Sequence, residues 1–541
     1  MDQAHDQSRA VSRRQVLRWG GTLAASAIGS LLLAACGGNP TATPATAATT
    51  SSSTTSKAAT TSSAAAAQTS SATTSAAASS AATSSAATSS AATSAATSST
   101  ATSSPGGAAT GSPAASASPS GGQQGVPSYI AHTDVAGEVL FWHFWGSSIR
   151  RTAIRRVIAQ FNQMYPKIKV NETFVPFSDI FTRALAAVAA GKGMPDVLVD
   201  DRTQLRTRAK NKIDNDLADL AKRDKVTGDS FWPFTWEESV SNGDPYGLPY
   251  ETDIRVLYYN KAALKDAGLD PETPPKNWDD LATYADKLDQ KDGNKLTRIG
   301  FYPLIGNIGL DSWAWCNGGE WQTKDFEPTM NDPKNVEALA WIKKWTDRYG
   351  KSNIDAFKGT FGQGNQDEFM SGKVAMKVDI QGYTSFLNFY NPSFKTKDGQ
   401  DAGYGVADIP PAPGNKPASF SGGFAMVNPR GSQQTEAAWE FIKYMSFVGQ
   451  ASWARDTYAM PTVESVAKND PVLNAQPNWP FFVKAMDYGR AGVYNPYYPT
   501  MMGDLLGPAV DDVLVRNKTP QEALDNAQQK AKQEVDKNKK G

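Results

Sequence analysis

A long run of small residues near the amino terminus decides which part of this chain can fold. Residues 40 to about 127 are almost only Ser, Thr, Ala, Pro and Gly, and Lys57 is the single charged residue among them. A segment without large apolar side chains buries too little surface to offset the conformational entropy that folding removes. We therefore predict a disordered stalk over residues 36–130 and a folded domain over residues 131–541.

Two short motifs precede the stalk. Residues 12–17 read Ser-Arg-Arg-Gln-Val-Leu, an apolar run covers about residues 20–33, and residues 33–36 read Leu-Ala-Ala-Cys. A basic region, a short apolar region and small residues at a cleavage site predict a signal peptide over residues 1–35. The paired arginines resemble the twin-arginine export signal, and the last four residues resemble a bacterial lipobox. These resemblances imply that Cys36 is acylated and that the protein is lipid-anchored to the outer face of the cytoplasmic membrane.

Charge and cysteine content exclude several classes of protein. The chain has 54 basic and 54 acidic residues, so net charge gives no reason to expect a nucleic-acid partner. Apart from Cys36, Cys316 is the only cysteine, so we expect no disulfide within the domain and a buried, inert thiol. The sequence contains no His-Glu-x-x-His, Gly-x-Ser-x-Gly or phosphate-binding Gly-rich motif. Residues 289–294 fit a β-turn better than a calcium loop. We expect no cofactor, no metal and no enzyme.

The start of the domain alternates short β-like runs with amphipathic helices. The pattern predicts strands over residues 137–142, 169–174 and 195–199, with helices over residues 149–165 and 181–190 between them. This order is typical of βαβ units and a largely parallel sheet, whose ligands bind beyond the carboxyl ends of the strands. The ends of the first and third strands therefore become candidate site positions.

Several stretches in order resemble a known family. They are residues 191–196 (Gly-Lys-Gly-Met-Pro-Asp), 244–261 (Asp-Pro-Tyr-Gly-Leu-Pro-Tyr-Glu-Thr-Asp, then Val-Leu-Tyr-Tyr-Asn-Lys at its end), 274–281, 369–376, 421–426, 498–501 and 520–523. Together they resemble the extracellular solute-binding proteins of bacterial ABC importers, in the carbohydrate-binding group that includes maltose-binding protein. The resemblance covers about residues 137–535.

The resemblance implies an α/β fold of the periplasmic-binding-protein type II class, with two lobes joined by hinge strands and a ligand in the cleft. The first hinge is expected near residues 253–255, the second near 410–413 and a third crossing between 463 and 478. Lobe one is then about 131–253 and 412–466, and lobe two about 254–411 and 467–541. The family works with the membrane subunits of a permease, and we expect a monomer.

Sugars are bound by flat aromatic faces and by side chains that make several hydrogen bonds. Asp201 and Arg202 lie where the family has an Asp-Arg pair that contacts sugar hydroxyls. The loop here is shorter by about two residues, so Asp200 is an alternative, and a solvated turn or a helix cap is the structural one. Asp253 matches a family carboxylate at the hinge, where it either reaches the ligand or stabilises the hinge.

Aromatic residues give further candidates. Trp313 and Tyr383 match family aromatic positions, and Trp313 is predicted to stack on a sugar, whereas Trp341 and Trp345 are assigned to packing. Alternation along the first strand is expected to bury one of Trp142 and Trp145 and to present the other to the cleft. The remaining candidates are Tyr250, Asp379, Gly422, Gly423, Tyr458 and Tyr498. The two glycines allow close approach of a ligand, and a tight turn explains them equally well.

The sequence therefore predicts a lipid-anchored binding protein that delivers a sugar or oligosaccharide to a permease. Two alternatives remain open: the same fold with a non-sugar solute such as glycerol phosphate, a polyamine or an organic anion, and a cell-tethered glycoside hydrolase or esterase. More than two uncompensated Arg or Lys side chains in the cleft would favour an anion, whereas aromatic residues with mixed Asp and Arg would favour a sugar.

Overall fold

A computed structural model describes residues 127, 129–394 and 403–540 of the chain. The predicted signal peptide, the lipidation site Cys36 and nearly all of the predicted stalk lie outside the described residues. Tyr129 is buried and stacks on Phe447 with ring centroids 5.4 Å apart, so ordered packing begins before residue 131. No helix within the described ranges has the length and apolar character needed to span a membrane.

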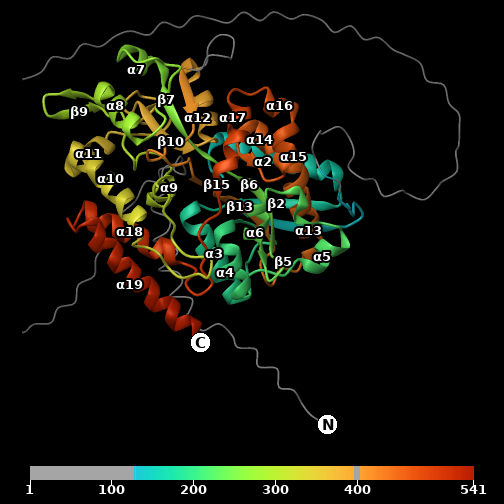
Figure 1. The fold of residues 1–541 in the computed structure, drawn as a ribbon. Helices are drawn as coiled ribbons and strands as arrows, with labels where there is room; N and C mark the ends of the chain where they lie inside the picture. The colour runs from blue at the N-terminus through green and yellow to red at the C-terminus, as the bar shows by residue number, and fades with distance from the viewer. Residues whose placement is uncertain (1–126, 128, 395–402, 541) are drawn as a thin grey trace, which may run out of the picture. The chain divides into compact units, whose positions relative to one another are not determined.

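The first lobe is built on a six-stranded sheet with the order β14-β6-β13-β3-β1-β2 (Figure 1). Its early elements are β1 Gly137–His143, α2 Ser148–Met164, β2 Ile168–Phe174, α3 Phe177–Ala190, β3 Val197–Asp201, α4 Arg202–Lys210, α5 Ala218–Arg223, α6 Pro233–Ser239, β4 Val240–Ser241, β5 Asp244–Pro245 and β6 Gly247–Thr252. Its later elements are β13 Gly423–Val427, α13 Thr435–Tyr444, a π-helical turn Met445–Gly449, α14 Gln450–Thr457 and β14 Met460–Pro461.

The pairing of this sheet corrects one prediction. β1 pairs in parallel with β2 and β3, as the βαβ pattern predicts. β13, however, runs antiparallel to both β3 and β6, and β14 runs antiparallel to β6. The sheet is therefore mixed, not largely parallel, because strands from distant parts of the chain complete it. Local periodicity identifies a strand but does not identify its partner.

The second lobe contains the antiparallel sheet β10-β7-β11. Its elements are β7 Arg255–Asn260, α7 Lys261–Asp266, α8 Trp278–Leu288, β8 Gln290–Asp292, β9 Lys295–Arg298, α9 Leu310–Cys316, α10 Pro333–Tyr349, α11 Lys351–Lys358, β10 Met376–Ile380, α12 Tyr383–Tyr390 and β11 Tyr404–Ala407. α18 Met501–Leu514 and α19 Pro520–Lys539 pack on each other, drawn in red in Figure 1, and bury side chains in the core of this lobe.

Short segments connect the two sheets. β6 and β7 are separated by only two residues, and the return from β11 to β13 passes through β12 Ser419–Phe420. After β14 the chain forms α15 Glu464–Asn469, α16 Pro471–Asn474, α17 Trp479–Ala485 and β15 Gly489–Arg490, and β15 pairs in parallel with β12. Side chains of α17 join a third apolar cluster that also contains Tyr258 of β7 and Met460 of β14. The lobe limits given above stay predictions.

Local signals in the sequence account for several element ends. Asn277 caps α8 by accepting hydrogen bonds from the backbone N–H groups of residues 279 and 280, as predicted. Asp280 reaches back one residue further than a capping box requires, to the N–H of Lys276 at 2.8 Å. α3 begins four residues before the predicted start, and ends as predicted at Gly191, which has a φ of 67°. Residues 290–298 form a hairpin, so the turn prediction for residues 289–294 is confirmed.

Candidate functional site

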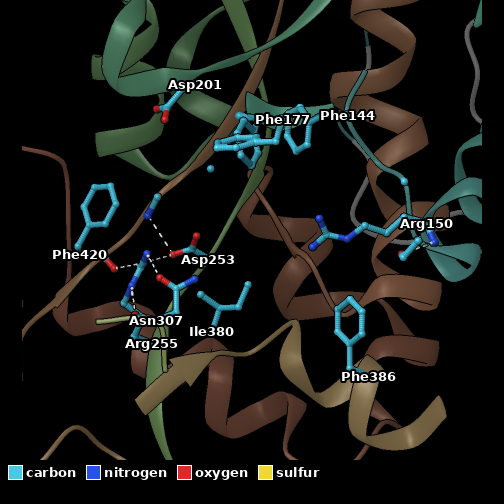
Figure 2. A pocket seen from close by; sticks show the side chains of 15 residues that line it. Phe144, Arg150, Phe177, Asp201, Asp253, Arg255, Asn307, Ile380, Phe386 and Phe420 are labelled. Carbon is cyan, nitrogen blue, oxygen red and sulfur yellow. Dashed lines mark hydrogen bonds and ion pairs between the residues drawn. The ribbon is translucent and has the colours of Figure 1, made fainter. Parts of the chain in front are cut away.

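A pocket of about 950 Å³, partly open to solvent, lies where the strand ends of both lobes meet (Figure 2). The first lobe supplies Gly146, Ser147 and Arg150 after β1, Asp201 at the end of β3, and residues 422–424 at the start of β13. The second lobe supplies Arg255 and Ile380 from its sheet and Phe386 from α12. A solute in this pocket therefore contacts both lobes at once.

Five phenylalanines make up the apolar part of the pocket. They are Phe144, Phe177, Phe386, Phe420 and Phe424. Phe144 packs against Phe177 and Phe424, with centroid distances of 5.0 Å and 4.6 Å. Aromatic rings held by such contacts offer rigid faces to an apolar surface of a ligand. The sequence analysis selected none of these five residues.

Asp201 has two roles in the structure. Its Oδ1 accepts hydrogen bonds from the backbone N–H of Thr203 at 2.9 Å and from the Thr203 hydroxyl at 2.7 Å, which caps α4. The residue also lines the pocket, and burial raises the pKa of its carboxyl. The helix cap and the pocket position, which the sequence left as alternatives, therefore occur together.

Asp253 and Arg255 connect the hinge to the pocket. Asp253 Oδ1 accepts a hydrogen bond from the N–H of Gly422 at 2.9 Å and pairs with the Arg255 guanidinium. Arg255 also donates to the carbonyl of Phe420 at 2.6 Å and to the carbonyl of Asn307 at 2.8 Å. These bonds tie the β6–β7 connection to residues 420–422, so Asp253 stabilises the hinge while it lines the pocket.

Arg150 is the charged residue of the pocket that these pairs do not include. Its guanidinium makes no printed hydrogen bond or ion pair with a described residue, and Figure 2 shows it on the opposite side of the pocket from Asp201. The pocket therefore has one aspartate–arginine pair, one further carboxylate and one further guanidinium. Formal charges balance, which suits a neutral ligand with many hydroxyl groups.

Arg202 does not line the pocket, contrary to the prediction. Its side chain is buried and donates to Glu238 Oε2 at 3.0 Å, to the carbonyl of Glu251 at 2.7 Å and to the carbonyl of Gly422 at 2.8 Å. A Cβ at Gly423, whose φ is 132°, would lie 2.3 Å from this guanidinium and 2.1 Å from the Glu251 carbonyl. Gly423 therefore makes room for Arg202, although both Gly422 and Gly423 also line the pocket.

Asp200, the alternative to Asp201, is fully buried and pairs with the Arg208 guanidinium on the other side of β3. Strand alternation explains the difference, because neighbouring residues of a strand point to opposite faces. Arg208 is also paired with Asp214, and the burial of both carboxylates beside one guanidinium raises the pKa of Asp200 to about 7.

The predicted tryptophan sites are core positions. Trp313 is fully buried, donates its indole N–H to the carbonyl of Pro303 at 2.9 Å, and packs against Trp341 at 4.9 Å between centroids. Trp145 is fully buried and lies 4.4 Å from Trp453. Trp142 is half-buried against the first-lobe core and does not line the pocket. β1 instead directs the pocket-facing position to Phe144.

The remaining predicted residues also lie outside this pocket. Tyr383 is buried beneath the ammonium of Lys377, 3.7 Å from its ring, and Asp379 pairs with the same ammonium at 3.0 Å. Tyr250 is fully buried beside Trp145. Tyr458 is buried at the end of α14, and Tyr498 is half-buried against the second-lobe core.

Cys316 and one acidic group test the expectations about reactive and metal-binding side chains. Cys316 is buried and burial raises the pKa of its thiol to about 12, so the prediction of an inert thiol is confirmed. His132, Asp224 and Glu440 lie close enough to hold a metal ion. The Lys443 ammonium, however, already bonds Asp224 at 2.5 Å and Glu440 at 2.8 Å, and so supplies a positive charge within this group.

The missed pocket residues share a signal that the sequence carries. Phe144 follows β1 directly, and Arg150 lies in the first turn of the next helix. Phe420 and Phe424 flank the two glycines at the start of β13. The same rule about strand ends therefore points to these residues once positions beyond the strand and residue types other than tryptophan are considered.

Comparisons with known proteins agree with this geometry. Residues 145–451 match the family of bacterial extracellular solute-binding proteins. The chain is 25% identical over 432 residues to the sn-glycerol-3-phosphate-binding periplasmic protein UgpB of Escherichia coli, covering 73% of this chain and 91% of that protein.

Two solved structures give the same result for the fold. The mannobiose-bound protein CpMnBP1 has a TM-score of 0.64 and 27% identity, over 73% of this chain and 99% of that one. An α-D-tagatose-bound ABC transporter solute-binding protein of Thermotoga lettingae has a TM-score of 0.62 and 25% identity, over 74% of this chain and 100% of that one. The chain therefore belongs to the bacterial extracellular solute-binding proteins and has their two-lobed α/β fold.

Proposed function

We propose that this protein is the substrate-binding component of an ABC importer and that it captures a sugar or oligosaccharide for delivery to the permease. The observation that carries the proposal is the lining of the pocket: phenylalanine faces, two carboxylates and two guanidinium groups supplied by both lobes. Sugar rings present apolar C–H faces and hydroxyl edges, and this mixture of groups is complementary to both.

The alternative of an anionic solute is supported by the similarity to UgpB. Against it, Arg255 is paired with Asp253, which leaves Arg150 as the one arginine lining this pocket without a printed partner among the described residues. A phosphate dianion would require more positive charge than one guanidinium beside two carboxylates supplies. The sugar-bound relatives CpMnBP1 and the Thermotoga protein favour the neutral class.

Capture requires closure of the lobes. Because Phe177 and Phe386 come from different lobes, a ligand that contacts both has higher affinity for the closed form and shifts the population toward it. The hinge bonds between Asp253, Arg255 and residues 420–422 lie at the floor of the same pocket. Closure then forms the surface that the permease subunits recognise.

Incubation with labelled oligosaccharides separates binding from hydrolysis. The proposal expects saturable binding at one site and recovery of the ligand with unchanged mass after prolonged incubation. Accumulation of shorter, labelled products would instead support the glycoside hydrolase alternative. A panel that includes glycerol 3-phosphate tests the anionic alternative, which is favoured if that compound binds and neutral sugars do not.

We further propose that residues 1–35 direct export and that Cys36 is acylated and becomes the mature amino terminus. The support is the sequence alone, Leu33-Ala34-Ala35-Cys36 directly after the apolar run. Cys36→Ser should leave the chain unprocessed or release it from the membrane if another peptidase cleaves it. Intact mass and membrane fractionation identical to those of the wild type would contradict lipidation.

A further inference from the structure

The pocket described above is not closed on every side. Phe420, which lines it, also lines a second compartment of about 850 Å³. The walls of this second compartment come from α4, α9 and α18, together with residues 492–500. α4 follows the first-lobe sheet, whereas α9 and α18 bury side chains in the second-lobe core, so this compartment also lies between the lobes.

The second compartment has the same mixture of polar and apolar walls. Thr203, Gln204 and Asp311 supply hydroxyl, amide and carboxylate groups, and Trp315, Met502 and Leu506 supply apolar surface. Asp311 forms no ion pair with a described residue, and burial raises the pKa of its carboxyl. An unpaired carboxylate at a partly buried surface gains most from a ligand that donates hydroxyl hydrogen bonds.

Phe420 is held firmly between the two compartments. Its backbone N–H donates to the Ser312 hydroxyl at 3.1 Å, and the Arg255 guanidinium lies 4.7 Å from the centre of its ring. At Gly492, a Cβ would lie 2.8 Å from Thr203 and 3.3 Å from Phe420. The absence of a side chain at residue 492 therefore leaves open the space beside Phe420 and Thr203.

The groove continues beyond the second compartment. Trp315, Gly492 and Val493 also line a third compartment of about 1350 Å³, which runs past Arg206, Glu320 and Arg490. The Arg490 guanidinium stacks on Trp315 at 4.5 Å and pairs with Glu320 at 2.8 Å. Three connected compartments in line suit a chain of linked rings better than a single ring.

We propose that the solute is a carbohydrate chain of at least two units, with one unit in the first pocket and the next beyond Phe420, against Asp311 and α18. This inference rests on the proposed function, since it names the length of the sugar that the same cleft binds. The similar structures do not decide the length, because one holds a disaccharide and another a single sugar.

The test is calorimetry of the whole protein with three matched series: mannose, mannobiose and mannotriose; glucose, maltose and maltotriose; galactose, galactobiose and galactotriose. In the series that binds, the disaccharide should bind at least about tenfold more tightly than the monosaccharide, which corresponds to ~1.4 kcal/mol. A monosaccharide that binds as tightly as its disaccharide overturns the inference while the proposed function stands. Failure of every saccharide to bind overturns both.

Two variants locate the second unit. Gly503→Leu places a side chain in the second compartment and should bring the affinity for the disaccharide down to that for the monosaccharide, without changing the latter. Gly507→Leu, one turn further along α18 at an exposed position with nothing within 4 Å of its Cβ, is the matched control and should change neither affinity.

Asp311→Asn gives an independent readout if Gly503→Leu does not fold. It should weaken disaccharide binding about threefold to tenfold, as expected for loss of a charge-assisted hydrogen bond, and leave monosaccharide binding unchanged. Equal losses for both ligands would place Asp311 in contact with the first unit and would overturn the assignment of the second. Unchanged disaccharide binding in both variants would also overturn it.

Discussion

Two aromatic clusters in this protein have opposite relations to solvent and therefore different roles. In the second lobe, Trp278, Trp313 and Trp341 pack on one another within the core, with centroid distances of 4.1 Å for Trp278–Trp341 and 4.9 Å for Trp313–Trp341. At the cleft, Phe177 and Phe424 are only partly buried and face the pocket. The comparison shows that position relative to the strand ends, more than the type of aromatic residue, decides which rings can meet a ligand.

The largest effect is expected from Trp313→Ala. Removal of a fully buried indole leaves a cavity in the second-lobe core, and the free energy of unfolding should fall by about 3–5 kcal/mol. Urea denaturation of the ligand-free protein measures it. If stability is nearly unchanged and sugar affinity falls instead, Trp313 faces the ligand and the contrast between the two clusters is wrong.

The neighbouring charged residues Asp201 and Arg202 repeat the contrast, with Arg202 on the structural side. Arg202→Met leaves the buried Glu238 carboxylate without its partner, so the free energy of unfolding should fall by about 3–5 kcal/mol. Denaturation of Arg202→Met together with Glu238→Gln is the control and should recover part of the loss. Wild-type stability for the single variant would mean that the guanidinium is not held as described.

Asp201 lies on the ligand side of this contrast. Asp201→Asn keeps the shape of the side chain but exchanges one acceptor for a donor, and affinity for the ligand should weaken by about 1.5–3 kcal/mol. The unfolding midpoint should change less, because asparagine also caps helices well. Calorimetry that finds wild-type affinity would leave Asp201 as a helix cap only.

Phe177→Ala is the counterpart of the Trp313 variant at the cleft. Affinity should weaken by about 0.5–1.5 kcal/mol, the range for one aromatic contact, while the loss of stability should be much smaller than for Trp313→Ala. Both quantities are measured on the same two variants. A reversed order of the two stability losses would break the comparison with which the clusters are distinguished.

The smallest effect near neutral pH is expected from acidification. Because burial raises the pKa of Asp201, its carboxylate is protonated at a higher pH than an ordinary aspartate. Affinity should therefore begin to fall before the usual aspartate range is reached and decline by up to about tenfold per pH unit below that pKa. Asp201→Asn should show a shallower dependence, and identical pH profiles would contradict the role of this carboxylate.

The fold could be predicted from the sequence where the signals are local. β1, α2, β2 and the start of α19 at Pro520 follow from periodicity, from Pro166 and from the Thr519 cap. The mixed sheet could not be predicted in this way, because β13 and β6 join it from distant parts of the chain.

The candidate site could be predicted only in part. Asp201 and Asp253 were found because they end strands or connect them, and both line the pocket. Asp200 and Arg202 were misplaced because the direction of each side chain at the end of β3 depends on strand alternation within two residues. The preference for tryptophan as a stacking residue selected Trp313 and missed the phenylalanines that the fold brings together at the cleft.

The most direct test of the central claim, a solute-binding protein that holds a neutral sugar between its lobes, is one thermal-shift screen of the whole protein. The screen contains mono-, di- and trisaccharides together with glycerol 3-phosphate. A saccharide at 100 times its dissociation constant should add about 2.7 kcal/mol to the free energy of unfolding and raise the melting temperature, whereas glycerol 3-phosphate should not. Stabilisation by glycerol 3-phosphate alone, or by no compound in the panel, would contradict the claim.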